Sequence, residues 1–435
     1  MNFKKKFIYI LILLVFFFCI FPYVNYASTP VNTNANAAIL ADLSSGKIIF
    51  EQNAYEKMYP ASTTKIMTAI LALENSKLSD TATVSQNAVS SVPLTYTNAN
   101  LQVDEILTME QLLYVLLIPS ANDAANVIAE HIAGSTESFA SMMNTKAKEI
   151  GCLNTNFINA NGVHNENHYS TAYDLFLISQ YAMKNAEFRK IVGTLRYTLP
   201  ITNKYDKEDR VFINTNRLIN SKNSQFYSFA TGIKTGYTDA AKNCLVASAK
   251  KDNLELVAVI LGSGSDNNID TNKFADAINL FEYGFNNFSN KVLCVKNSVF
   301  KVVNPKNATK ESNSLNILYE NEISVLVNNS LNSWDFSPEV EIDEKISAPI
   351  TKGSVIGKVT YTVDNIKYTT NLIAGQDIDS NSIFSIIFKI ALIVVGLYIL
   401  CKVFGGSRHK RKKKNKSGTH KKSKSTYVSP YKFRL

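Results

Sequence analysis

Three short polar runs, far apart but ordered, constrain this chain more than any other feature of its sequence. They are Ser62-Thr-Thr-Lys65, Ser120-Ala-Asn122 and Lys234-Thr-Gly236. Each run alone is weak evidence, since a serine with a lysine three residues later also occurs at Ser44 and Lys47. The three runs are informative together only if the fold brings a helix start, an interhelical loop and a strand to one cleft.

The first run has the surroundings of a nucleophile. Ser62 follows Pro60 and opens a predicted helix over 62–73, and Lys65 lies on the same face within hydrogen-bond reach. A serine hydroxyl becomes a good nucleophile when a neighbour takes its proton. Lysine does so only as the free amine, which requires a pKa lowered by burial and by a second cation, here Lys234. The helix N-terminus also favours negative charge at Ser62, and the alternative is an ordinary surface pair.

The second run falls in a polar break between two predicted apolar helices. Loops held between helices are good places to project polar groups into a cleft. Ser120 is predicted to relay a proton between Lys65 and the leaving group, and the Asn122 amide to hold a backbone carbonyl of the substrate. The alternative is that Ser120 and Asp123 only cap the second helix.

The third run is predicted to lie at an edge of a later sheet. Gly236 would leave room for a substrate to lie along the strand. Lys234 and Thr235 offer a charge and a hydroxyl to a substrate carboxylate. The backbone N–H groups of Ser62 and Tyr237 would form an oxyanion hole. The alternative is a solvated lysine turn.

The apolar spacing predicts an α+β fold, with an antiparallel sheet packed against a helical cluster. Hairpins are predicted over 37–51 and from 244 to 261. Helices are predicted over 62–73, 108–117, 122–132, 139–150, 170–183 and 274–285, and the second of these opens on a capping box. These elements form a predicted first domain over 35–288. A small all-β domain follows over 290–375.

Both termini carry membrane signals. Three lysines and an apolar stretch predict a signal peptide over 1–27, with a retained anchor as the alternative. After a short link over 376–382, the segment 383–404 contains two charges, Lys389 and Lys402, in an otherwise apolar run and is predicted to be a transmembrane helix. The tail over 405–435 is strongly basic, which predicts a cytoplasmic location and contact with anionic lipid. The predicted topology is a single-pass protein of the cell membrane with its body on the extracytoplasmic face.

The charge and the metal-binding residue types exclude two classes of partner. The net charge is +10, but 13 of the 46 basic residues lie from Lys402 onward. Without the terminal segments the body has a charge of about −7, which argues against nucleic acid. Cys152, Cys244 and Cys294 are widely spaced and predict neither disulfides nor a metal site. His164 and His168 lack the glutamate of a zinc motif, so packing roles are expected and no metal or cofactor is predicted.

At these residues the chain resembles the D-alanyl-D-alanine carboxypeptidases among the low-molecular-mass penicillin-binding proteins, the serine peptidases with S-x-x-K, S-x-N and K-T-G motifs. The resemblance covers about 35 to 375, and its residues are Pro60–Thr68, Leu112–Ala125, Met143–Ala147, Asn161–His164, His168–Leu175, Thr231–Thr238 and Ile346–Val363. It implies a fold like that of serine β-lactamases and penicillin-binding proteins, with the second domain as a pedestal.

The resemblance also implies a chemistry. The enzyme would remove the terminal D-alanine from peptidoglycan pentapeptide stems, with Ser62 as nucleophile and Lys65 as base. Penicillins and other β-lactams would acylate Ser62 as mimics of the substrate. These stem peptides, β-lactam inhibitors and the membrane are the expected partners.

The chain departs from its relatives at three points. Ala121 replaces the glycine that often separates the serine from the asparagine. Lys273 precedes Phe274 where relatives often carry arginine, and lysine binds a carboxylate as a point charge rather than as a fork. Many relatives attach by an amphipathic C-terminal helix, whereas the segment here is predicted to span.

Three other functions remain open from the sequence. A class A-like β-lactamase would carry a glutamate in an E-x-x-L-N run, and Glu149 to Asn154 is one residue too long for it. A D,D-endopeptidase acting on cross-links is chemically close to a carboxypeptidase. A non-catalytic wall or penicillin sensor would not require the complete set of chemical groups.

Overall fold

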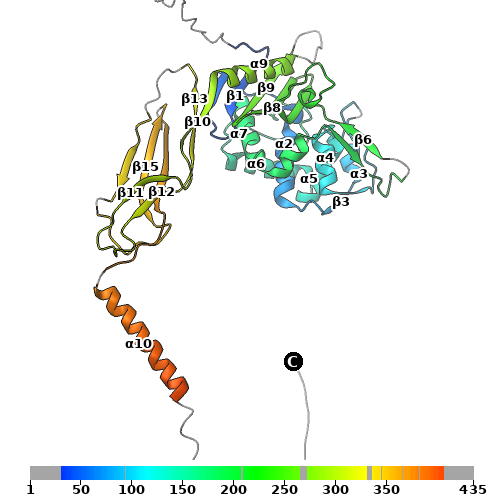
Figure 1. Cartoon of the computed structure of the whole chain (residues 1–435). Helices are drawn as coiled ribbons and strands as arrows, with labels where there is room; N and C mark the ends of the chain where they lie inside the picture. Colours follow the sequence, from blue (N-terminus) through cyan, green and yellow to red (C-terminus); the bar gives the residue numbers. More distant parts are fainter. Residues whose placement is uncertain are drawn as a thin grey trace, which may run out of the picture. The chain divides into compact units, whose positions relative to one another are not determined.

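The computed structural model describes residues 31–93, 95–206, 209–264, 272–330, 336–343, 345–364, 366–381 and 383–405. The predicted signal peptide and almost all of the basic tail lie outside these residues. The chain divides into two compact units (Figure 1). One runs to Leu293 and includes Ile323–Phe336, and the other contains Cys294–Glu322 and the chain from Ser337. The segment 323–336 thus groups with the first unit, although it lies inside the range predicted for the second domain.

A five-stranded antiparallel sheet with the order β2-β1-β9-β8-β7 forms the centre of the first unit. Its strands are β1 (Ala37–Asp42), β2 (Ile48–Gln52), β7 (Ala230–Thr238), β8 (Lys242–Lys251) and β9 (Leu254–Ser263). Both predicted hairpins are confirmed, because β1 pairs with β2 and β8 pairs with β9. The strand β7 carries the third polar run and lies at the sheet edge, as predicted.

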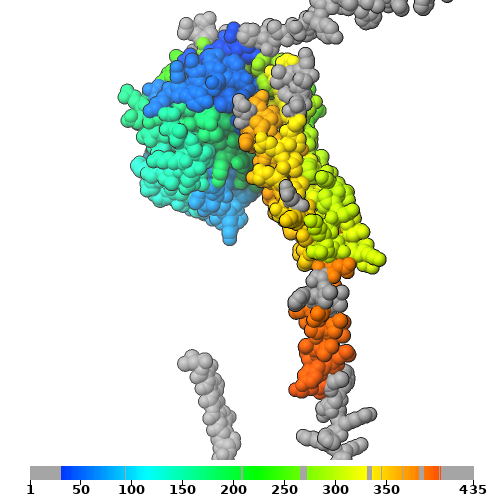
Figure 2. All heavy atoms as spheres, turned by 90° about the vertical axis from the view of Figure 1, so that its left-hand side faces the viewer, coloured from blue at the N-terminus to red at the C-terminus, as the bar shows by residue number. Residues whose placement is uncertain are grey.

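Apolar side chains cover both faces of this sheet. Every residue of β1 is buried, and alternate positions enter two different cores, with Ile39 in the first and Leu40 in the second. The first core contains α2 (Lys65–Asn75), α4 (Met109–Leu117), α5 (Asn122–Ala133), α6 (Thr136–Ile150), α7 (Ala172–Ala182) and α8 (Ala186–Val192). The second contains α9 (Asn272–Asn287). Figure 2 shows the first unit as a closely packed body.

The predicted helices are found, with one change at the nucleophile. The capping box at Thr108 and Gln111 is present at the start of α4. The helix predicted from Ser62 is in fact a 3₁₀ turn, η1 (Ala61–Thr64), followed by α2. Ala61 has φ 46°, a left-handed conformation that no propensity pattern indicates.

Several short elements were not predicted. The small hairpins pair β3 (Thr81–Thr83) with β4 (Ile106–Thr108) and β5 (Arg196–Leu199) with β6 (Arg210–Ile213). The others are α3 (Gln86–Ser90), η2 (Arg217–Ile219) and β10 (Phe288–Cys294), which pairs with β13 (Ile323–Asn328). The segment from β6 to η2 matters most, because it reaches the cleft described below.

The second unit is built on an antiparallel sheet with the order β11-β12-β16-β15-β14, which confirms the predicted all-β character. The strands are β11 (Val299–Val303), β12 (Leu315–Tyr319), β14 (Glu339–Ile342), β15 (Val355–Val363) and β16 (Ile366–Ala374). Alternate residues such as Ile317, Val359 and Leu372 are buried.

The chain then forms α10 (Ile383–Gly405). Its side chains are described at 387–400 and at Lys402. Counting only described residues, no helix reaches the length and apolar character needed to cross a membrane.

Candidate active site

The turn that carries Ser62 is held by two close backbone approaches. A Cβ added at Gly162 would lie 1.9 Å from the carbonyl oxygen of Ala61. A Cβ added at Gly236 would lie 3.0 Å from the backbone nitrogen of Ser62. Gly236 therefore has a second role besides the one predicted, because the missing side chain lets β7 approach the nucleophile turn.

Lys65 is fully buried, and its amine contacts three oxygen atoms. Its Nζ lies 2.9 Å from Ser62 Oγ, 2.7 Å from Asn122 Oδ1 and 2.6 Å from the carbonyl oxygen of Asn161. A neutral amine has two N–H donors and one lone pair. Asn122 and Asn161 can only accept at these atoms, so they take both donors and the lone pair is left for the Ser62 hydroxyl.

Electrostatics favours this neutral amine. Burial lowers the pKa of Lys65 well below its ordinary value, and the nearby charge of Lys234 lowers it further, while Asp123 acts in the opposite direction. Burial followed by the charge of Lys273 lowers the pKa of Lys234 to about 7. The solvated-turn alternative for Lys234 is wrong, because this side chain is 1% exposed.

Ser120 has φ 71°, and its buried Oγ has no hydrogen-bond partner among the described residues. The capping alternative is therefore wrong for Ser120, since Ala121 is the N-cap of α5 and provides no side-chain bond. Asp123 accepts from the amides of Ala99, Leu101 and Ala124. It thus fixes the loop before α4, which lines the cleft.

The Asn122 amide is already engaged within the protein. Its Oδ1 accepts from Lys65, and its Nδ2 donates to the carbonyl oxygen of Thr97 at 2.8 Å. One N–H of the amide is left for the substrate carbonyl predicted from the sequence. Asn122 also orients the base, which sequence reasoning missed.

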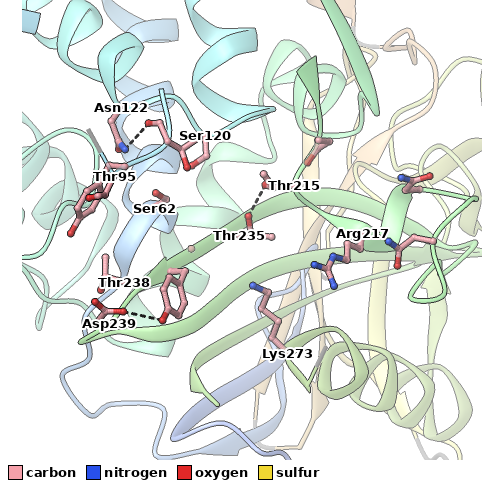
Figure 3. Close-up of a pocket in the computed structure, with 17 residues that line it drawn as sticks. Ser62, Thr95, Ser120, Asn122, Thr215, Arg217, Thr235, Thr238, Asp239 and Lys273 are labelled. Atoms are coloured by element: carbon pink, nitrogen blue, oxygen red, sulfur yellow. Dashed lines mark hydrogen bonds between the residues drawn. The ribbon is translucent and has the colours of Figure 1, made fainter. Parts of the chain in front are cut away.

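The three runs meet in one cleft of about 650 Å³ (Figure 3). Among the predicted residues, Ser62, Ser120, Asn122, Thr235, Gly236 and Tyr237 line it, while Lys65 and Lys234 lie buried beside it. Further lining residues, missed from the sequence, are Thr95, Tyr96, Thr97, Asn214, Thr215, Arg217, Asn220, Asn223, Thr238 and Asp239. Thr238 and Asp239 lie just after the third run, whereas the others come from segments without a motif and are brought here only by the fold.

Arg217 lies near Lys273 and provides a guanidinium group at this side of the cleft. Lys273 lines the cleft and donates from Nζ to Asn243 Oδ1 at 3.1 Å. Arg217 lines the same cleft, and both cations lie against the ring of Phe274. The guanidinium fork that Lys273 lacks is therefore present on η2. Thr235 is held by Thr215 through a 2.6 Å hydroxyl contact.

His168 contacts the nucleophile turn through a hydrogen bond to Thr64. Its Nδ1 accepts from the amide of Ile158 at 3.1 Å, so its Nε2 carries the proton and donates to Thr64 Oγ1 at 2.8 Å. Burial, followed by the charges of His164 and Lys65, lowers the pKa of His168 to about 4. This is the expected packing role. In the part of the chain that the structure describes, no cluster of His, Cys, Asp and Glu could hold a metal ion.

Two family models match the chain. The model described as D-alanyl-D-alanine carboxypeptidase matches residues 24–265, more than half of the sequence. This chain belongs to that family. A model of the C-terminal domain of penicillin-binding protein 5 matches residues 288–380. The chain is thus a serine D-Ala-D-Ala carboxypeptidase of the penicillin-binding type.

Individual relatives agree with this assignment. The carboxypeptidase is 32% identical over 350 residues to the D-alanyl-D-alanine carboxypeptidase DacF of Bacillus subtilis, covering 79% of this chain and 85% of the relative. It is 35% identical over 251 residues to the carboxypeptidase of Streptomyces sp. strain K15, covering 55% of this chain and 83% of the relative. The solved structure of penicillin-binding protein 5 from Haemophilus influenzae matches with a TM-score of 0.64 and 26% identity, covering 81% and 99% of the two chains.

The carboxypeptidase lacks the β-lactamase arrangement of acids in its described residues. Glu149 lies near the end of α6, is 57% exposed and pairs with Lys146 at 2.8 Å. Among the described residues that line the cleft, Asp239 is the only acid, and it accepts a hydrogen bond from the Tyr237 hydroxyl. No described glutamate is therefore in place to activate a deacylating water.

Proposed function

We propose that the chain removes the terminal D-alanine from peptidoglycan pentapeptide stems through an acyl-enzyme on Ser62. The observation that carries this proposal is the 2.9 Å contact between Lys65 Nζ and Ser62 Oγ, with both amine protons committed elsewhere. A buried amine with a lowered pKa, aimed at a serine hydroxyl, is the arrangement that activates a nucleophile.

Acylation begins when Lys65 takes the Ser62 proton and Oγ attacks the carbonyl carbon of the penultimate D-alanine. The negative charge that develops on the carbonyl oxygen is stabilised by the backbone N–H groups of Ser62 and Tyr237. The close approach of Gly236 to the Ser62 nitrogen supports this pairing, because Tyr237 is the next residue of β7. The tetrahedral intermediate then expels the amine of the terminal D-alanine.

The leaving amine needs a proton as the C–N bond breaks. Ser120 is the relay, since its buried hydroxyl faces the cleft and has no partner among the described residues. Lys65 donates to Ser120, which donates to the amine. Water then attacks the ester, with Lys65 acting again as base, and Ser62 is regenerated.

The carboxylate of the terminal D-alanine binds at the cationic side of the cleft. Thr235 supplies a hydroxyl, and Arg217, Lys273 and the buried Lys234 supply positive charge. Arg217 can bind a carboxylate through two parallel hydrogen bonds. A β-lactam presents a carboxylate and a carbonyl in similar positions, and acylates Ser62 for the same reason.

The segment over 383–404 anchors the protein in the membrane, with the catalytic unit on the extracytoplasmic face. The support is the sequence, in which this segment is apolar apart from Lys389 and Lys402 and is followed by a strongly basic tail. Extraction of membranes with alkaline carbonate tests this proposal. Release of the full chain into the soluble fraction would contradict it.

The catalytic proposal is tested by D-alanine release from a pentapeptide and by labelling with fluorescent penicillin, using the full chain. Ser62→Ala abolishes both. Ser44→Ala is the matched control, since Ser44 belongs to another Ser-x-x-Lys run but binds Asp42 through a 2.7 Å hydrogen bond. Retained release by Ser62→Ala would refute the mechanism.

Two further assays separate the other functions. Rapid turnover of benzylpenicillin would indicate a β-lactamase. A cross-linked dimer cleaved faster than the pentapeptide would indicate an endopeptidase.

A further inference from the structure

The charges that line the cleft are segregated along β7. In the view of Figure 3, Arg217 and Lys273 lie on one side of Ser62, and Asp239 lies on the other. The cationic side is already assigned to the substrate carboxylate. The opposite side carries the only acid among the described lining residues.

Asp239 is available to a ligand. It is exposed, and its Oδ1 accepts from the Tyr237 hydroxyl at 3.0 Å. No lysine or arginine of the described chain lies within ion-pair distance of it, and its Oδ2 accepts no hydrogen bond from a described residue. A carboxylate that lines a cleft without a cation partner is suited to bind a positively charged group.

The spacing along β7 indicates which part of the substrate reaches Asp239. Asp239 is the first residue of the turn after β7 and follows Thr235 by four residues, which places it at most about 13 Å further along the chain. With the terminal carboxylate at Thr235, the stem residue two places before the C-terminus lies about 7 Å further along the strand. A side chain of lysine length at that position covers the remaining distance.

We propose that Asp239 is a specificity-determining residue that binds a primary ammonium group on the side chain of the third stem residue. This inference rests on the proposed function, because it requires a pentapeptide stem bound along β7. The ligand class is a peptide whose third residue is a diamino acid with a free side-chain amine.

The test compares two pentapeptides that differ only in this amine, one with lysine and one with norleucine at the third position. D-alanine release by the full chain is measured for each. The lysine peptide is expected to have a kcat/KM about fivefold higher, mainly through KM, since a partly exposed charge pair contributes modestly. Asp239→Asn keeps an oxygen that can accept from Tyr237 and is expected to bring the ratio close to one.

Asp252→Asn is the control, because Asp252 is exposed in the turn between β8 and β9 and does not line the cleft. It is expected to keep the wild-type ratio. A wild-type ratio near one, or an unchanged ratio in Asp239→Asn, would overturn the inference and leave the proposed function standing. Absence of D-alanine release from both peptides would refute the proposed function, and the inference with it.

Discussion

Replacing Asn122 by aspartate tests directly whether the neutral form of Lys65 is the base. The substitution keeps the size of the side chain and places a carboxylate where Asn122 Oδ1 lies 2.7 Å from Lys65 Nζ. An adjacent opposite charge favours the ammonium form and raises a lysine pKa by about 1–3 units. This charge opposes the burial and Lys234 contributions, which lower the pKa.

The expected loss of rate follows from this shift. Each unit by which the pKa of Lys65 exceeds the pH lowers its neutral fraction about tenfold, so acylation at neutral pH falls by up to about 1000-fold for a three-unit rise. The fold is expected to survive. Asn122 is the first residue of α5, where a negative charge stabilises the helix by about 0.3–1 kcal/mol. This offsets part of the loss of about 1–3 kcal/mol from the missing hydrogen bond to Thr97.

The assay is the rate of fluorescent penicillin acylation between pH 6 and 10, with thermal unfolding measured on the same preparations. The midpoint of the pH profile moves up in Asn122→Asp, and the rate recovers at high pH. Asn122→Ala is the control, because it removes the bond to Thr97 and also the bond to Lys65 without adding a charge. A folded Asn122→Asp protein with the wild-type pH profile would refute the role of neutral Lys65.

Three further changes have definite expected outcomes. The pKa of His168 is lowered to about 4, so the folded protein resists protonation there and loses stability as the pH falls from about 6.5 to 4. In His168→Gln, the free energy of urea unfolding should depend less on pH in this range. An unchanged pH dependence would contradict this expectation. Lys234→Met removes a buried cation whose pKa is lowered to about 7. Burying this charge destabilises the folded state below pH 7, and the penalty disappears as the pH rises toward 10.5, so at pH 6 the variant should be more stable to unfolding by about 1–3 kcal/mol while losing penicillin acylation. A less stable variant at pH 6 would be the contrary result. Gly236→Ala should slow acylation about tenfold or more by moving the Ser62 turn, whereas Gly264→Ala, where a Cβ meets only ordinary contacts at 3.7 Å, should not; equal rates for the two variants would argue against the close approach.

Local sequence determined the elements and the reacting groups. Short apolar runs joined by turn residues indicated both hairpins of the central sheet, and the capping box at Thr108 appears as predicted. The contact between Ser62 and Lys65 was expected from their three-residue spacing at a predicted helix start, because residues three apart on a helix are neighbours. The all-β character of the second unit was also predicted from local sequence.

Tertiary structure decided how those groups are tuned. The backbone carbonyl of Asn161 accepts a hydrogen bond from the Lys65 amine. Arg217 adds a guanidinium group to the cleft, and Asp239 adds a carboxylate on its other side. Gly236 lines the cleft and also lets β7 approach the nucleophile turn. These roles depend on contacts between segments distant in sequence, and burial and orientation at such contacts have no local pattern. The three ordered runs therefore indicated the chemistry, whereas packing set the pKa values and the charge on each side of the cleft.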